Sequence, residues 1–175
     1  RTVAVPGTGL DRVYPPEQAS LLRVEGHRIK VIELDGAIFF GTADRLAFEA
    51  MRAADGAQYL ILDLRRVTMI DASGALMLQK LTRLLREQNV TLLLAHISAT
   101  SRLGRAIQGA GVFTQRHHTD SFDDADRALE WAERQLLDQS DTAASDRELA
   151  IGEFALLEGL SPAELEFMKP YLDRQ

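Results

Sequence analysis

Residues 60–74 read LILDLRRVTMIDASG, and this stretch decides the fold. With Tyr59 in front of it, the run to Leu64 is nearly all apolar and has polar residues on both sides. A strand buried on both faces has this pattern, which favours a parallel sheet covered by helices. Near Asp71 the apolar spacing becomes helical. The stretch therefore predicts a buried strand that leads directly into a helix.

The segments on either side repeat this alternation of strand and helix. Apolar residues at helical spacing predict a helix over 43–54, with Thr42 as its cap and Gly56 as its stop. Asn89 ends the helix that begins near Asp71, and its many leucines, Leu76 among them, place that helix largely inside. Strand and helix alternation predicts parallel strands with right-handed crossovers.

Further along the chain, residues 91–95 read as the next buried strand, and Ser98 or Thr100 is placed to cap a third helix. A short edge strand is expected at Val112-Phe113. A capping box over 121–124 then predicts a fourth helix. The expected fold is α/β, with a mixed, mainly parallel sheet covered by helices.

The N-terminal part carries weaker signals. Residues 1–20 contain glycines and prolines but no apolar period, which is typical of a connector. A short strand is expected over 21–24 and a second over 29–34. Asp35-Gly36 is a common hairpin turn and predicts a returning strand over 37–40.

The C-terminal part reads as a helical extension. A polar linker over 138–145 is expected to precede two short helices, which start at Ser145 and Ser161 and are separated by Gly159. Their many apolar residues are too many for free helices, so they pack either on the main domain or on a partner; we favour a partner, on another chain or beyond Gln175.

Composition excludes several functions. The formal net charge is −6 and no basic patch is visible, which argues against a nucleic-acid partner. The chain has no cysteine, and the adjacent His117-His118 pair suits metal ligation poorly, so no metal site is predicted. No apolar run approaches the ~20 residues of a membrane-spanning helix. The start at Arg1 is expected of a piece of a longer protein.

Residues 60–74 also resemble the signature of the STAS family. In that family a buried strand runs into a loop with an Asp-Ser/Ala/Thr-Ser-Gly motif, which opens the following helix; here it is Asp71-Ala72-Ser73-Gly74. The resemblance implies a STAS-like fold over residues 21–139. It also implies a non-catalytic domain whose work is interaction and regulation.

Within the family, the sequence most resembles the C-terminal domain of SulP anion transporters. Residues 14–18 resemble the connector from their membrane domain, and residues 36–44 resemble their strand-to-helix entry. Residues 140–175 are then a linker and an extension similar to the start of a cyclic-nucleotide-binding domain, whose β-roll and phosphate-binding loop are absent. The resemblance implies a place at the cytoplasmic face of a bacterial inner membrane. The partners would be the rest of the transporter, an unknown regulatory protein or a second copy.

The loop from Thr68 through Asp71 and Ser73 to Gly74 is the candidate site for phosphorylation, an anion or a partner. In anti-sigma-factor antagonists of this fold, the serine that matches Ser73 is a phosphorylated switch, and phosphate would change what docks there. Alternatively, Asp71 is simply a helix cap and Gly74 permits close packing, which explains these residue types unaided. For a transporter domain we favour this second interpretation.

No cofactor is predicted, although an unpaired helix start also favours a nucleotide phosphate at Asp71–Gly74. A Walker lysine in a glycine-rich loop is missing. His96 ends a buried strand and is expected to be a hydrogen-bonded structural residue, and Trp131 is expected to pack within its helix.

Overall fold

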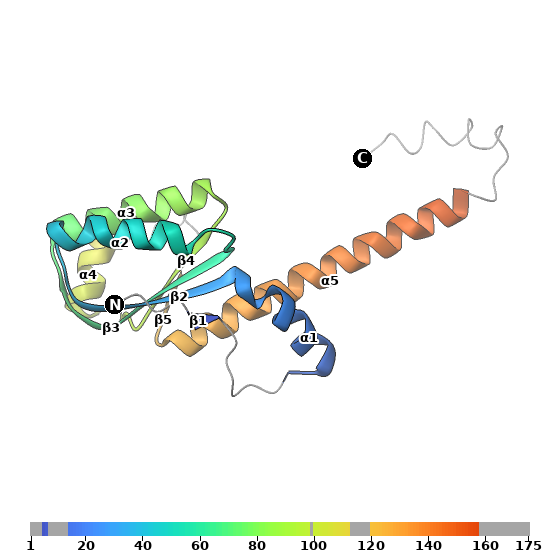
Figure 1. The fold of residues 1–175 in the computed structure, drawn as a ribbon, viewed down its shortest axis with the longest axis horizontal. Coiled ribbons are helices and arrows are strands. Elements are labelled where there is room, and N and C mark those ends of the chain that lie inside the picture. Colours follow the sequence, from blue (N-terminus) through green and yellow to red (C-terminus); the bar gives the residue numbers. More distant parts are fainter. Residues whose placement is uncertain (1–4, 7–13, 99, 113–119, 158–175) are drawn as a thin grey trace. The chain divides into compact units, whose positions relative to one another are not determined.

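Strand β3 (Tyr59–Ile70) lies at the centre of the sheet and leads into helix α3 (Ala72–Glu87) through Asp71. The computed structural model describes residues 5–6, 14–98, 100–112 and 120–157. The other elements are β1 (Val5–Pro6), α1 (Pro16–Glu25), a 3-10 turn (Gly26–Arg28), β2 (Ile29–Ile38), α2 (Phe40–Ala53), β4 (Thr91–Ala95), α4 (Arg102–Gly109), β5 (Asp120–Phe122) and α5 (Ala125–Leu157). Figure 1 shows their course.

The sheet in the described residues has the order β1-β2-β3-β4-β5. Strands β2 to β5 are parallel, and β1 is antiparallel to β2. Tyr59 lies opposite Thr91 and Asp63 opposite Ala95, so the two strands expected to be buried are neighbours. The predicted α/β fold with a mixed, mainly parallel sheet is confirmed.

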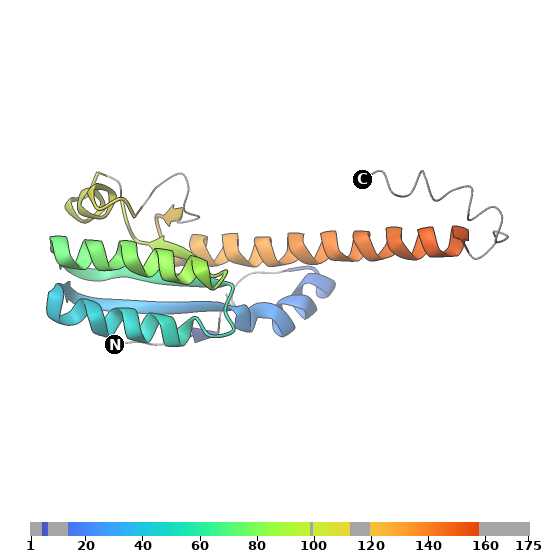
Figure 2. The same cartoon turned by 90° about the horizontal axis from the view of Figure 1, so that it is seen from above.

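Each face of the sheet has its own apolar core, because side chains alternate along a strand. Leu60, Leu62 and Leu64 point toward α2, α3 and α4, whereas Tyr59 and Ile61 point toward the first turns of α5. Figures 1 and 2 show α2 and α3 side by side on one face of the strands. The run from Tyr59 to Leu64 is buried on both faces, as its composition predicts.

The predictions for residues 21–24 and 37–40 are wrong. Residues 21–24 lie in helix α1, which begins with Pro16 at its first position, where proline's fixed φ suits a helix. Asp35-Gly36 makes no hairpin, because β2 continues to Ile38 beside β3. Its register shifts on both sides of this dipeptide, and Gly36 has a φ of 89°. The dipeptide therefore forms an irregularity within one strand.

Most helix ends follow the expected chemistry. The predicted helix over 43–54 is present as α2, but Thr42 lies inside it and Phe39 holds the cap position, where its N–H donates to the hydroxyl of Thr42 at 3.0 Å. Gly56 after the helix has a φ of 69°. Asn89, with a φ of 60°, follows α3. Ser101 caps α4 in place of Ser98 or Thr100, because its hydroxyl accepts the N–H of Gly104 at 2.9 Å.

The cap of α5 is shifted from the predicted box. Ser121 and Phe122 belong to β5, and Asp124 accepts the N–H of Arg127 at 2.7 Å. Val112 lies in no strand, and Phe113 lies outside the described residues. The predicted fourth helix is present as α5, with Leu129, Ala132 and Leu136 buried against the sheet.

Residues 138–145 are helical rather than a linker, since α5 continues through them to Leu157. The hydroxyl of Thr142 donates to the carbonyl of Asp138 within this helix, at 2.9 Å. The chain divides into two compact units, residues 1–136 and 137–175. The second predicted tail helix, from Ser161, and Gly159 lie outside the described residues. The predicted domain boundaries stay predictions.

Candidate functional site

Asp71 holds the junction between β3 and α3 together. Its carboxylate Oδ1 accepts the N–H of Gly74 at 2.7 Å, which caps the helix. Its own N–H donates to the carbonyl of Ile38 at 3.1 Å, which ties the junction to the end of β2. Asp71 is therefore a structural cap, and its negative charge at the helix start weighs against a nucleotide phosphate there.

Gly74 permits the closest approach between α3 and β2. A Cβ at this position would lie 2.7 Å from the carbonyl oxygen of Ile38 and 3.0 Å from the side chain of Ile70. Such distances are shorter than carbon and oxygen atoms tolerate, so any side chain would push the helix away from the strands. The glycine of the predicted motif is thus explained by packing.

Ser73 is the polar residue of the motif that the fold leaves exposed, beside the exposed Ala72. It lies in the first turn of α3 and is exposed, between the capping Asp71 and the buried Gly74. The structure brings Asp71, Ser73 and Gly74 together as predicted. Thr68 is exposed too, but it stands within β3, so the predicted loop is shorter than residues 68–74.

Three large apolar residues near this junction in the sequence or in the strand pairing are exposed to solvent. Phe39 is 46% exposed, Met69 54% and Leu76 58%. Each is within two residues of Ile38, Ile70 or Gly74, which meet at the close contact. We call Phe39, Met69, Ser73 and Leu76 the Ser73 rim.

Sequence reasoning found Ser73 but missed the three apolar residues of this rim. Leu76 was expected inside because α3 is rich in leucine, but it shares with Ser73 the side of the helix that faces away from the sheet. The signal that could have found it is the i, i+3 spacing of Ser73 and Leu76, since Ala75 and Leu78 already fill the inward face. The exposure of Met69 could have been predicted from strand alternation, because neighbouring residues point to opposite faces of a sheet and Ile70 is partly buried.

A second polar pair lies where β4 ends beside the middle of β3. Asp63 is 5% exposed, and its Oδ1 lies 2.8 Å from Nδ1 of His96. The same carboxylate oxygen accepts the N–H of Arg65 at 2.8 Å. His96 has a φ of 57°, an uncommon conformation for a residue with a side chain. The contact lies between the two central strands, but Nδ1 of His96 is buried without a hydrogen bond to any described residue, so the hydrogen-bonded role predicted for His96 is not confirmed.

Trp131 and Glu133 have structural roles. Trp131 packs edge-to-face on Tyr59, with ring centroids 5.8 Å apart, and this confirms its predicted packing role. The buried carboxylate of Glu133 accepts a hydrogen bond from the hydroxyl of Tyr14 at 2.6 Å.

His117 and His118 lie outside the described residues. In the described ranges, no three His, Asp or Glu side chains are grouped to hold a metal ion, and no helix is long and apolar enough to cross a membrane.

Comparisons with known proteins agree with this architecture. Glutaminase 2 of Bradyrhizobium diazoefficiens is 32% identical over 160 residues, which is 91% of this chain. The chain spans only a quarter of that relative's length. A sulfate transporter family protein from Wolinella succinogenes has a similar structure, with 26% identity and a TM-score of 0.54 over 77% of this chain and 98% of the other.

The SulP transporter STAS domain from Vibrio cholerae shares the fold, with 21% identity and a TM-score of 0.51 over 70% of this chain and 98% of that one. The family model for the STAS domain matches residues 21–117. These residues contain the strand-to-helix junction at Asp71 and the sheet from β2 to β4. The chain belongs to the STAS domain family.

Proposed function

We propose that this chain is a non-catalytic regulatory module that docks through the Ser73 rim onto the rest of a larger protein. The observation that carries the proposal is the exposure of three large apolar residues, Phe39, Met69 and Leu76, near the ends of β2 and β3 and the start of α3, where Ser73 is exposed too. Large apolar side chains left exposed by a fold are candidates for an interaction surface. The polar groups that chemistry would need, Asp71 and the Gly74 N–H, are already bonded to each other.

For the larger protein we favour a glutaminase over our sequence-based expectation of a SulP transporter. The similarity to Glutaminase 2 extends over 160 residues, well beyond the span 21–117 of the STAS domain. The similarity to Glutaminase 2 therefore includes the segments on either side of the STAS domain. Such segments usually differ between proteins that share only the domain, so their similarity favours a glutaminase. In this setting the module would adjust glutamine hydrolysis by the attached catalytic part.

The SulP transporter remains the second candidate. It is supported by the structural similarity to the sulfate transporter family protein, which covers nearly the whole of that chain. In this setting the module would sit at the cytoplasmic face of the membrane and regulate transport of sulfate or a related anion. The residues of the Ser73 rim would serve the same docking role.

One experiment separates the two settings. The complete protein is expressed and assayed for glutamine hydrolysis, and for sulfate uptake after reconstitution into lipid vesicles. We expect hydrolysis that changes in Leu76→Ser and stays unchanged in Val24→Ser, a matched control because Val24 is an equally exposed apolar residue on α1. Anion uptake without glutamine hydrolysis would instead show that the module belongs to a transporter. Equal activity of both variants would contradict the docking role of the rim.

Phosphorylation of Ser73 is an alternative mode of the same function. A phosphoryl group would add roughly −1.5 to −2 charge beside exposed apolar side chains and weaken docking. Incubation with a cognate kinase, followed by mass spectrometry, tests this mode. An unmodified Ser73, together with a Ser73→Asp variant that regulates normally, would dispose of the switch and leave the docking role intact.

A further inference from the structure

We propose that helix α1 is a releasable strap, closed by a hydrogen bond from Tyr14 to Glu133 in the first turns of α5. Opening this bond would let the helix swing about the turn at Gly26–Arg28 while the sheet stays folded. We call residues 14–28 the α1 strap; it shares no residue with the Ser73 rim. The inference rests on the proposed function in one respect, because a regulatory module needs two states and the strap provides them.

The bond that closes the strap joins two elements that are far apart in the sequence. The hydroxyl of Tyr14 donates to Oε2 of Glu133, 119 residues further along the chain, at 2.6 Å. Glu133 is only 1% exposed, whereas carboxylates are seldom buried without specific partners. Without this donor the buried carboxylate loses a hydrogen bond that water at a closed site replaces poorly. The closed state of the strap is therefore well defined.

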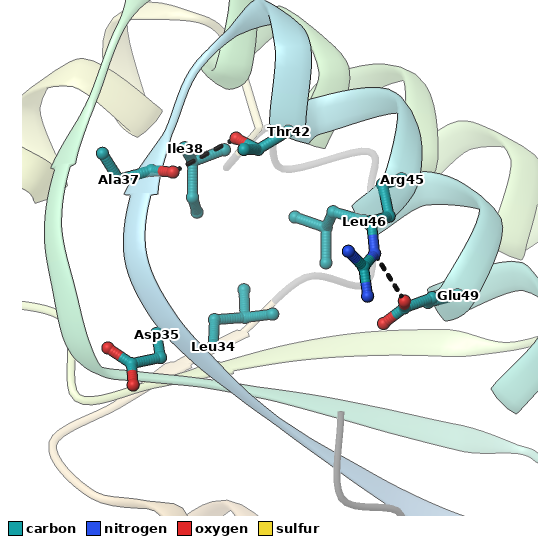
Figure 3. A pocket seen from close by; sticks show the side chains of 8 residues that line it. All are labelled: Leu34, Asp35, Ala37, Ile38, Thr42, Arg45, Leu46 and Glu49. Carbon is teal, nitrogen blue, oxygen red and sulfur yellow. Dashed lines mark hydrogen bonds and ion pairs between the residues drawn. The ribbon is translucent and has the colours of Figure 1, made fainter. Parts of the chain in front are cut away.

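Polar pairs within one helix act differently. Figure 3 shows such a pair in the groove beside α2, where Nε of Arg45 donates to Oε1 of Glu49 at 3.0 Å. These two residues are one turn apart, so their bond supports the helix to which both belong. The bond between Tyr14 and Glu133 instead depends on how α1 and α5 are placed against each other, and it breaks when α1 moves away.

Few apolar contacts hold α1 in its closed position. Of its ten residues only Leu22 is buried, with 4% exposure. Val24 in the same helix is 66% exposed. Elements that bury little apolar surface open locally at a free energy well below that of global unfolding. We therefore expect the bond from Tyr14 to contribute a large share of what keeps α1 closed.

The two ends of the strap are built differently. Pro15 and Pro16 follow Tyr14 directly and occupy the cap and the first position of α1, and their fixed φ angles make Tyr14 move together with the helix. At the other end, the turn at Gly26–Arg28 leads into Ile29, which is fully buried in the core beneath α5. The second end therefore stays attached when the first is released.

Hydrogen exchange on the 175-residue chain tests the strap, with mass spectrometry as the readout. Tyr14→Phe removes one hydroxyl and should speed amide exchange over residues 16–25 roughly tenfold, the effect of losing one hydrogen bond to a carboxylate. Exchange over 59–64 should stay unchanged. Ser20→Ala is the matched control, because it also removes one hydroxyl, whose bond to the carbonyl of Pro16 lies within α1. Its exchange should be no faster than that of the parent.

A second background shows whether Glu133 is the partner. In Glu133→Ala, adding Tyr14→Phe should cause no further acceleration, since the acceptor is already absent. Equal acceleration by Tyr14→Phe in the parent and in Glu133→Ala would overturn the proposed bond. Parent-like exchange in Tyr14→Phe would overturn it too. Acceleration that extends equally over 59–64 would show global destabilisation and would overturn a separate release of the strap.

The regulatory role is tested on the complete protein, by glutamine hydrolysis or anion uptake. Activity should change in Tyr14→Phe and equal that of the parent in Ser20→Ala. Unchanged activity in Tyr14→Phe would overturn the switching role of the strap, whatever Leu76→Ser does. A change in Tyr14→Phe without one in Leu76→Ser would support the strap and contradict docking through the Ser73 rim, so the two failures are distinguishable.

Discussion

The two halves of β3 belong to one strand and behave in opposite ways. Residues 59–64 are buried on both faces, between β2 and β4 and beneath the helices. Residues 65–70 extend past the end of β4, pair only with β2 among the described residues, and are mostly exposed. The comparison indicates that stability resides in the first half and that recognition is available to the second, which ends at the junction with α3 held by Asp71 and Gly74.

The largest effect is expected in the buried half. Leu62→Ala should lower the free energy of unfolding by about 2–5 kcal/mol, because Leu62 is fully buried and its removal leaves a cavity. Urea unfolding followed by circular dichroism measures it. Met69→Ala, in the exposed half of the same strand, is the control and should change stability by less than about 0.5 kcal/mol. Equal losses in the two variants would erase the contrast.

The next effect is at the junction with α3, where the exposed half ends. Gly74→Ala should cost about 1–3 kcal/mol, since its Cβ would collide with the carbonyl oxygen of Ile38. Gly109→Ala, at the end of α4, is a matched control because an added Cβ there meets no atom within 4 Å. Thermal unfolding of the two variants gives the comparison. A Gly74→Ala protein as stable as the parent would show that the helix moves away freely.

A smaller effect is expected for the cap. Asp71→Ala should cost about 0.5–2 kcal/mol, because the N–H of Gly74 loses its acceptor at the helix start. Asp71→Ser keeps an acceptor for this N–H and should recover most of the loss. If alanine and serine behave alike in chemical denaturation, the cap contributes little.

The sequence predicts the buried half of β3 well because burial on both faces leaves a continuous apolar run that few other structures produce. It predicts Asp71, Ser73 and Gly74 because helix caps depend on local chemistry. It fails at Asp35-Gly36, since the same dipeptide serves a hairpin or an irregular strand, and only pairing with β3 through Ile38 decides between them. It fails similarly at residues 138–145, where polar composition is compatible with an exposed helix.

The Ser73 rim could be predicted only in part. The exposure of Ser73 follows from its place in the first turn of α3. The exposure of Leu76 and Met69 depends on which face of α3 meets the sheet and on how far β3 extends past β4, and neither is a local property of the sequence. Leucine content alone indicated a buried helix without indicating its exposed side.

The smallest expected effect on stability accompanies the largest on function. Leu76→Ser should change the free energy of unfolding by less than about 0.5 kcal/mol, because Leu76 already faces solvent. The same change should alter regulation of the complete protein. Differential scanning calorimetry on the chain and an activity assay on the whole protein would show the two outcomes separately.

Hydrogen exchange provides the most direct test of docking through the Ser73 rim. Amide exchange is measured by mass spectrometry for the complete protein and for the 175-residue chain. We predict slower exchange in the complete protein over residues 68–77, with unchanged exchange over 59–64. Identical exchange over 68–77 in the two samples would contradict docking through this rim.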